Sequence, residues 1–86
     1  MEVHNWKRLV SLLWASLQVA SWPDRAKPLR HIESVPAAIE SLEQLLEWLP
    51  DDSEEHRATR LCHQLLTGKT QDETEFLEVC RQLTGT

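Results

Sequence analysis

The stretch SVPAAIESLEQLLEWLP, residues 34–50, decides the fold of this 86-residue chain. Its apolar side chains recur at intervals of three and four residues, so they form one stripe along an α-helix. Ser34 is a favourable N-cap, Pro36 fits the first turn because no intrahelical hydrogen bond is lost there, and Pro50 ends the pattern. The residues of the stripe are Val35, Ala38, Ile39, Leu42, Leu45, Leu46 and Leu49.

Two more amphipathic helices are predicted after this one. Asp52 and Glu55 stand three residues apart as a capping box before the first of them, and Gly68 supplies a left-handed residue after its end. Thr70 and Glu73 repeat the capping box before the last helix. The apolar stripes are Ala58, Leu61, Cys62, Leu65 and Leu66 in one helix and Phe76, Leu77, Cys80 and Leu83 in the other.

The first third of the chain admits two interpretations. Five apolar residues fit helical spacing and favour a helix over residues 5–17: Trp6, Leu9, Val10, Leu13 and Leu17. Alternation within residues 15–20 instead favours a strand, and a second extended stretch, residues 29–33, follows a linker bracketed by Pro23 and Pro28. The second interpretation is a β-hairpin with a long loop.

Four segments between residues 14 and 83 carry a family resemblance: LQVAS, RHIES, AIESLEQLLEWLP and HRATRLCHQLLTGKTQDETEFLEVC. In this order they resemble an uncharacterised bacterial family called domain of unknown function 982. The resemblance implies two short strands followed by three helices, and it implies no activity. Residues 1–13 have no counterpart in it. The matching positions are Leu17, Val19, Arg30, Ile32, Ser34, Trp48, Pro50, Ala58, Cys62, Gly68 and Phe76.

We therefore predict an α+β fold, in which a short N-terminal β-hairpin packs with three C-terminal α-helices. A chain of 86 residues supports one hydrophobic core, so residues 1–86 form a single small domain. It divides into an N-terminal extension (1–13), the hairpin (14–33) and the three helices (34–83). The alternative is an all-α arrangement of four helices.

Charge is distributed unevenly along the chain. Residues 1–32 carry a net charge of +3 and residues 33–86 a net charge of −8. Because phosphate binding needs a basic patch, the acidic part disfavours nucleic acid and anionic lipid. The basic N-terminal third supports an alternative function, a small nucleic-acid-associated regulator that stacks bases on tryptophans. Its basic residues are Lys7, Arg8, Arg25, Lys27 and Arg30.

The two cysteines are too few for a disulfide scaffold in a chain this small. Cys62 and Cys80 both fall on apolar helix faces, and we expect buried, reduced thiols in a cytoplasmic protein. A single bridge between neighbouring helices is the alternative. No apolar run reaches the roughly 20 residues that a membrane span requires, so we expect no membrane partner.

No pattern in the sequence indicates an enzyme. His56, Cys62 and His63 could offer nitrogen and sulfur ligands to zinc, but their spacing matches no metal-binding motif and we predict no metal or other cofactor. Consecutive helical residues project about 100° apart, so Cys62 and His63 do not form a nucleophile–base pair. With Gly68 and Gly85 as the only glycines, the chain has no phosphate-binding loop and no evident small-molecule substrate site.

The four tryptophans are more than a core of this size needs, and they are the most informative feature of the sequence. The leucines already suffice for a core of this size, and large aromatic side chains outside a core are typical of protein interfaces. The alternative is that the rings cap the edges of the core. We predict a protein-interaction or regulatory module that binds a protein partner or itself as a homodimer. The predicted contact residues are Trp14, Trp22 and Trp48, with Arg25 and Arg30 at the rim.

Overall fold

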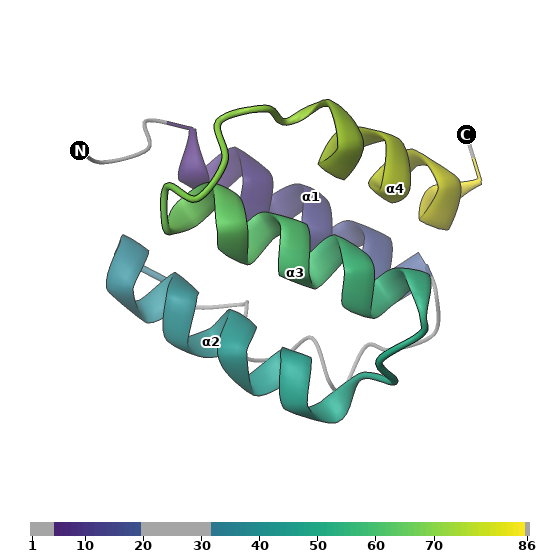
Figure 1. Ribbon diagram of the computed structural model, residues 1–86, viewed down its shortest axis with the longest axis horizontal. Helices are drawn as coiled ribbons and strands as arrows, with labels where there is room; N and C mark the ends of the chain where they lie inside the picture. Colours follow the sequence, from purple (N-terminus) through teal and green to yellow (C-terminus); the bar gives the residue numbers. More distant parts are fainter. Residues whose placement is uncertain (1–4, 20–31, 86) are drawn as a thin grey trace.

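The computed structural model describes residues 5–19 and 32–85, which form four α-helices (Figure 1). In chain order these are α1 (Trp6–Val19), α2 (Val35–Trp48), α3 (Glu54–Leu66) and α4 (Thr74–Thr84). The third helix is central: α3 packs against each of the other three, and α4 also packs along α1. Figure 1 shows α2 and α4 on opposite sides of α3. In the described part of the chain, no helix is long and apolar enough to cross a bilayer.

The predicted α+β fold is wrong. The segment expected to start a β-hairpin over residues 14–33 is the second half of α1, and no strand occurs among residues 5–19 and 32–85. The all-α alternative describes the fold, and residues 6–13, expected as an extension, form the start of α1. The rest of the predicted hairpin, residues 20–31, lies outside the described residues.

The hydrophobic core explains why helical spacing prevails at the N-terminus. All five apolar residues of the helical pattern in α1 are buried, whereas strand alternation would have turned half of them to solvent. Each helix contributes one stripe to a single cluster. Its members are Trp6, Leu9, Val10, Leu13, Leu17, Ala38, Leu42, Leu45, Leu49, Ala58, Leu61, Cys62, Leu65, Leu66, Phe76, Val79 and Cys80.

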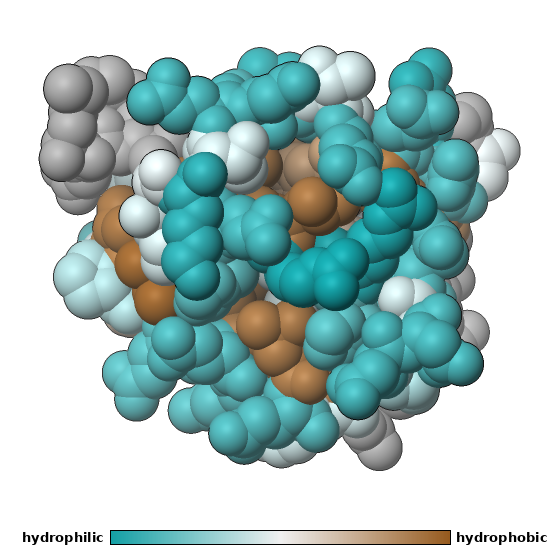
Figure 2. All heavy atoms as spheres, in the orientation of Figure 1, coloured by the Kyte–Doolittle hydropathy of each residue, from teal (hydrophilic) through white to brown (hydrophobic). Residues whose placement is uncertain are grey.

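The distribution of polar and apolar side chains on the outer surface follows from the same helix stripes. Figure 2 shows that hydrophilic side chains cover most of the viewed face, and that apolar side chains emerge in the seams on either side of α3. Two large apolar side chains in the described residues are exposed, Trp48 at 45% and Leu77 at 39%. Leu77 was expected in the core, and that prediction is wrong. Phe76, its neighbour in sequence, occupies the core position of this turn instead, with 0% exposure.

Several helix ends lie where the sequence predicts them. Ser34 caps α2, because its Oγ accepts a hydrogen bond from the Ala37 N–H at 3.3 Å. Pro36 lies in the first turn of α2, and the helix ends before Pro50. Gly68 follows α3 with φ +80°, a conformation that costs little without a Cβ.

Both predicted capping boxes are wrong. Ser53, not Asp52, caps α3: its Oγ accepts from the His56 N–H at 3.1 Å. Before α4, the Asp72 carboxylate accepts from the Thr74 N–H at 2.9 Å, and Glu73 at the N-cap position makes no capping bond with its side chain. Hydrogen bonds from the Thr74 side chain and from its backbone N–H hold the pKa of Asp72 below its usual value.

The position of the α3 cap can be tested by a matched pair of substitutions. Ser53→Ala removes the acceptor for the His56 N–H, and we expect it to lower the free energy of unfolding by about 1 kcal/mol. Asp52→Ala removes only a charge near the helix N-terminus, and we expect a loss of roughly 0.3–0.5 kcal/mol. Urea denaturation followed by circular dichroism measures both. Equal losses, or a larger loss for Asp52→Ala, would show that Ser53 is not the cap.

Candidate functional site

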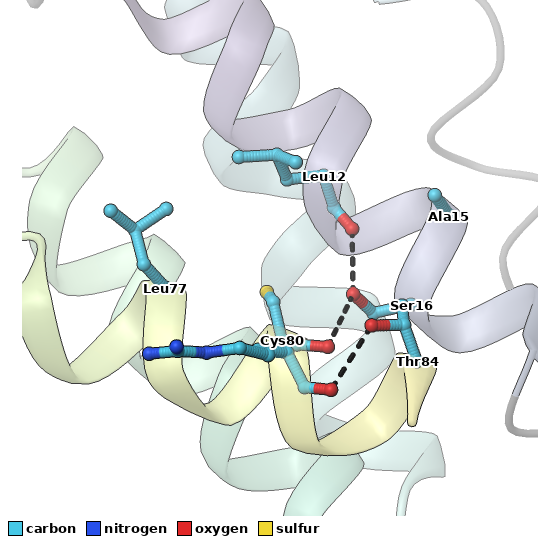
Figure 3. A pocket seen from close by; sticks show the side chains of 7 residues that line it. Leu12, Ala15, Ser16, Leu77, Cys80 and Thr84 are labelled. Carbon is cyan, nitrogen blue, oxygen red and sulfur yellow. Dashed lines mark hydrogen bonds between the residues drawn. The ribbon is translucent and has the colours of Figure 1, made fainter. Parts of the chain in front are cut away.

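An open apolar groove runs between α1 and α4 (Figure 3). The two helices lie parallel: the Asn5 amide donates to the Glu73 carboxylate at 3.0 Å near one end, and Ser16 lies against Cys80 further along. The groove has a volume of about 340 Å³, and Leu77, one of the two exposed large apolar residues in the described part of the chain, forms part of its wall. Its lining residues are Leu12, Ala15, Ser16, Leu77, Cys80, Arg81 and Thr84.

The hydroxyl groups in the groove already have partners within the domain. The buried Ser16 hydroxyl donates to the Leu12 carbonyl at 2.8 Å and lies 3.5 Å from the Cys80 carbonyl (Figure 3). The Thr84 hydroxyl donates to the Arg81 carbonyl at 3.1 Å. A hydroxyl has one proton to donate, so neither group offers a free donor to a ligand. Contact with the groove is therefore mainly apolar, with the Arg81 guanidinium as its charged group.

The two cysteines are free and buried. Burial raises the pKa of Cys62 to about 12, and the neighbouring Cys80 adds to the increase. Burial also raises the pKa of Cys80, although a hydrogen bond with Ser16 opposes it. The thiolate is the nucleophilic form of cysteine, so both side chains are inert near neutral pH. The sulfur of Cys80 contributes packing rather than chemistry to the groove.

The acidic side chains of α4 do not line the groove, and Glu75 is directed away from it. Arg57 of α3 forms an ion pair with Glu75, and Glu54 and Glu78 also act on it. The hydrogen bond that Arg57 donates to Glu75 is the main reason that the pKa of Arg57 is raised. Glu75 therefore belongs to the α3 side of α4. Only Arg81 of this helix's charged residues lines the groove.

One basic residue of α1 lies near the groove. Arg8 lies four residues before Leu12 and seven before Ala15, so the three residues share one face of the helix. Arg8 is exposed, and α1 contains no acidic residue. Arg81 in the groove and Arg8 one turn before its lining place two positive charges near this surface, in a chain whose net charge is −5.

The structure distributes the tryptophans differently from the sequence prediction. Trp48, a predicted contact residue, is 45% exposed at the end of α2. Trp14 is half-buried against the core, and its indole N–H is enclosed without a partner among the described residues. Trp6 is buried, with the Lys7 ammonium 5.7 Å from its ring centre. The remaining predicted contact residues, Trp22, Arg25 and Arg30, lie outside the described residues.

Sequence reasoning missed the groove because its walls come from distant segments. Leu12 and Leu77 are 65 positions apart, and nothing in either helix indicates that α1 and α4 are neighbours. One local signal was available for Leu77. Phe76, Val79, Cys80 and Leu83 already form a stripe at intervals of three and four, and Leu77 lies at its edge.

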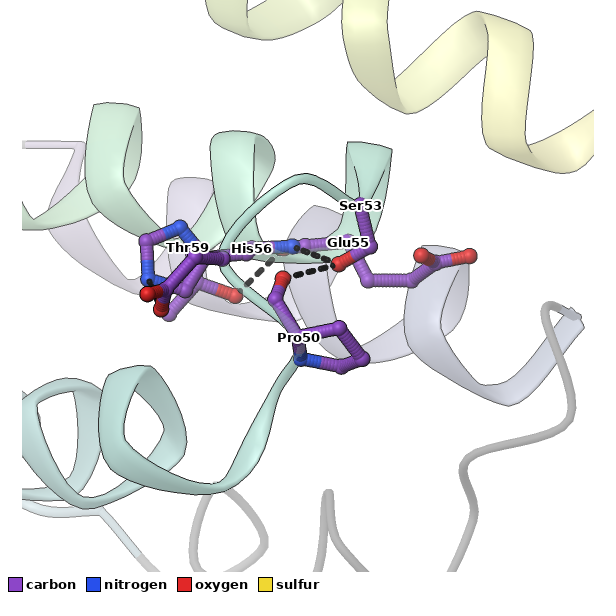
Figure 4. A network of polar contacts seen from close by, with 6 residues as sticks. Pro50, Ser53, Glu55, His56 and Thr59 are labelled. Atoms are coloured by element: carbon purple, nitrogen blue, oxygen red, sulfur yellow. Dashed lines mark hydrogen bonds and ion pairs between the residues drawn. The ribbon is translucent and has the colours of Figure 1, made fainter.

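The histidines of α3 lie along its seam with α2, and each faces a carboxylate. The His63 Nε2 is 3.2 Å from the Glu43 carboxylate, and the His56 Nε2 is 3.6 Å from Asp51. Figure 4 shows His56 at the α3 N-terminus, where Ser53 also donates to the Pro50 carbonyl at 2.7 Å. Cys62 points into the core instead. Within residues 5–19 and 32–85, no group of three or more metal-binding side chains is brought together.

Comparison with known proteins adds no assignment: no family model, curated protein or solved structure matches this chain. The resemblance to domain of unknown function 982 stays a prediction. So does the nucleic-acid-associated alternative, because it depends on basic residues in the segment 20–31. The candidate site rests on the geometry of the α1–α4 groove and on the exposed ring of Trp48.

Proposed function

We propose that this domain is a non-catalytic protein-interaction module that associates with itself. The observation that carries the proposal is the α1–α4 groove, in which an exposed leucine lies within an apolar hollow. Exposed apolar surface beside a concave apolar site is typical of protein contacts, because burying it there recovers the hydrophobic free energy. Trp48 supplies a second apolar contact point of the kind enriched at interface centres.

The nature of the groove favours a protein over a small molecule as its occupant. Ligand sites for small molecules usually place several convergent polar groups within an apolar pocket. Here the two hydroxyl groups of the lining are committed to backbone carbonyls, and the thiol is protonated. What remains is a shallow apolar strip with one guanidinium, which suits an apolar side chain from another polypeptide.

Self-association is testable by sedimentation velocity at increasing micromolar concentrations. We expect the wild-type sedimentation coefficient to rise with concentration, and Leu77→Gln to weaken association by about tenfold or more because it removes a central apolar contact. Gln71→Ala, in the loop between α3 and α4, is an exposed control that should behave like the wild type. A wild-type protein that stays monomeric throughout this range contradicts the proposed self-association.

A further inference from the structure

We infer that the α1–α4 groove of one subunit receives the outer face of α2 from a second copy of the chain, with Trp48 entering the groove. The inference rests on the proposed self-association and specifies its geometry. Two different surfaces meet in such a contact, so it is heterologous rather than two-fold symmetric.

The outer face of α2 provides an acidic surface with an aromatic side chain. Glu40, Gln44, Glu47 and Trp48 lie at positions i, i+4, i+7 and i+8, which places them together on the side opposite the buried stripe. All four are exposed, and α2 contains no basic residue. Glu43, the remaining glutamate of the helix, faces His63 of the same subunit instead.

The groove complements this surface in charge. Arg81 lines the groove, and Arg8 lies one turn before Leu12 on the same face of α1. Glu75 of α4 pairs with Arg57 on the α3 side of the helix. A glutamate of the entering helix would therefore meet the Arg81 guanidinium, and the Glu73 carboxylate near the start of α4 already accepts from the Asn5 amide. Complementary potentials of this kind orient partners and suppress competing contacts. A groove-to-groove dimer would instead bring the arginines of the two subunits together.

The groove also suits the entering side chain in size and polarity. An apolar cavity of about 150 Å³ is enough to bind benzene, and this groove has about 340 Å³. Its volume therefore accommodates an indole ring with part of the adjoining helix turn. The apolar walls formed by Leu12 and Leu77 would contact the ring faces.

The contact must form between subunits. Figure 1 shows α2 and α4 on opposite sides of α3, so Trp48 cannot reach the groove of its own chain. A heterologous contact leaves one groove and one α2 face unused at the two ends of each dimer. Further copies can then add, and the assembly grows with concentration unless it closes into a ring.

Mixing two variants tests the geometry directly. Leu77→Gln damages the groove and leaves the α2 face intact, whereas Trp48→Gln damages the α2 face and leaves the groove intact. We expect each variant alone to lose association by about tenfold or more. An equimolar mixture should form a heterodimer with near wild-type affinity, because one undamaged groove meets one undamaged face. This heterodimer should not grow further, since its unused surfaces are both damaged.

The outcomes separate the inference from the proposed function. If the wild type associates but only one variant weakens it, the contact is symmetric through that residue and the inference is overturned. If both variants weaken it and the mixture stays monomeric, the inference is also overturned, while self-association stands. A wild-type protein that is monomeric contradicts both the proposed self-association and the inferred contact. Circular dichroism of each variant, with Gln71→Ala as the control, establishes that loss of association is not loss of folding.

A charge exchange tests the electrostatic part of the inference. Arg81→Glu and Glu47→Lys should each weaken association when tested alone, because each places like charges across the contact. Their mixture should recover association, since the reversed pair attracts again and the unchanged pair is retained. Absence of recovery, with both variants folded, would show that these two surfaces do not meet.

Discussion

Phe76→Ala is expected to lower the free energy of unfolding by about 3–5 kcal/mol, the largest stability loss that we predict for a single substitution. Phe76 is fully buried in the core where α4 packs, with 0% exposure. Its removal forfeits the transfer free energy of the ring and leaves a cavity that neighbouring helices only partly fill. Domains of this length are stabilised by about 4–13 kcal/mol in total, so the loss is a large share of the whole.

Leu77→Ala is the matched control for this prediction. It changes the next residue of the same helix, and Leu77 is 39% exposed in the groove. We expect a loss of about 1 kcal/mol, because the Leu77 side chain is only partly withdrawn from water and alanine favours a helix more strongly. Urea denaturation at a concentration where the proteins are monomeric measures both variants. Similar losses for the two positions would contradict the placement of Phe76 in the core and Leu77 outside it.

The sequence was sufficient where local spacing and end signals agree. In α2, the Ser34 cap, the apolar stripe and Pro50 each indicate the same helix, and the observed helix matches them. The start of α3 was misplaced by one residue. Asp52 and Ser53 are both good caps, and only the path of the chain after Pro50 decides which of them receives the His56 N–H.

The N-terminal segment could not be assigned because two patterns overlap there. Leu17 belongs both to a helical stripe and to an alternating run, so periodicity alone permits a helix or a strand. The decision depends on tertiary contacts: α1 buries its stripe against α3 and α4, and a strand would need a partner edge. The family resemblance favours a strand in this segment. The five apolar residues at helical spacing favour a helix, and the structure buries all five.

The candidate site was only partly predictable for the same physical reason. The exposure of Trp48 follows from its position off the apolar stripe of α2, which sequence alone reveals. The groove requires knowledge that α1 lies parallel to α4, a long-range arrangement that no local pattern encodes. The tryptophan content therefore predicts one contact surface, at Trp48. The other, the groove, is lined by residues of two distant helices, among them Leu12, Leu77 and Arg81.

Alkaline pH is expected to destabilise the domain through Cys62. Burial raises the pKa of this thiol from its usual 9.0 to about 12 in the folded chain. Between these two values the unfolded chain has lost the thiol proton and the folded chain has kept it, so rising pH favours unfolding. The stabilisation is complete below pH 9 and decreases by about 1.4 kcal/mol for each pH unit above it. The loss therefore reaches roughly 2–3 kcal/mol by about pH 11.

Cys62→Ala isolates this contribution. The substitution removes a buried sulfur, so the variant starts less stable at neutral pH, but it also removes the titrating group. We expect its free energy of unfolding to fall less steeply than that of the wild type above pH 9, so the two curves converge. Tyrosine is absent from the chain, which removes another group that would titrate in this range. The raised pKa of Cys80 acts in the same direction in both proteins. Urea denaturation under reducing conditions across this pH range measures the slopes, and parallel curves would show that the Cys62 thiol is not held protonated by burial in the core.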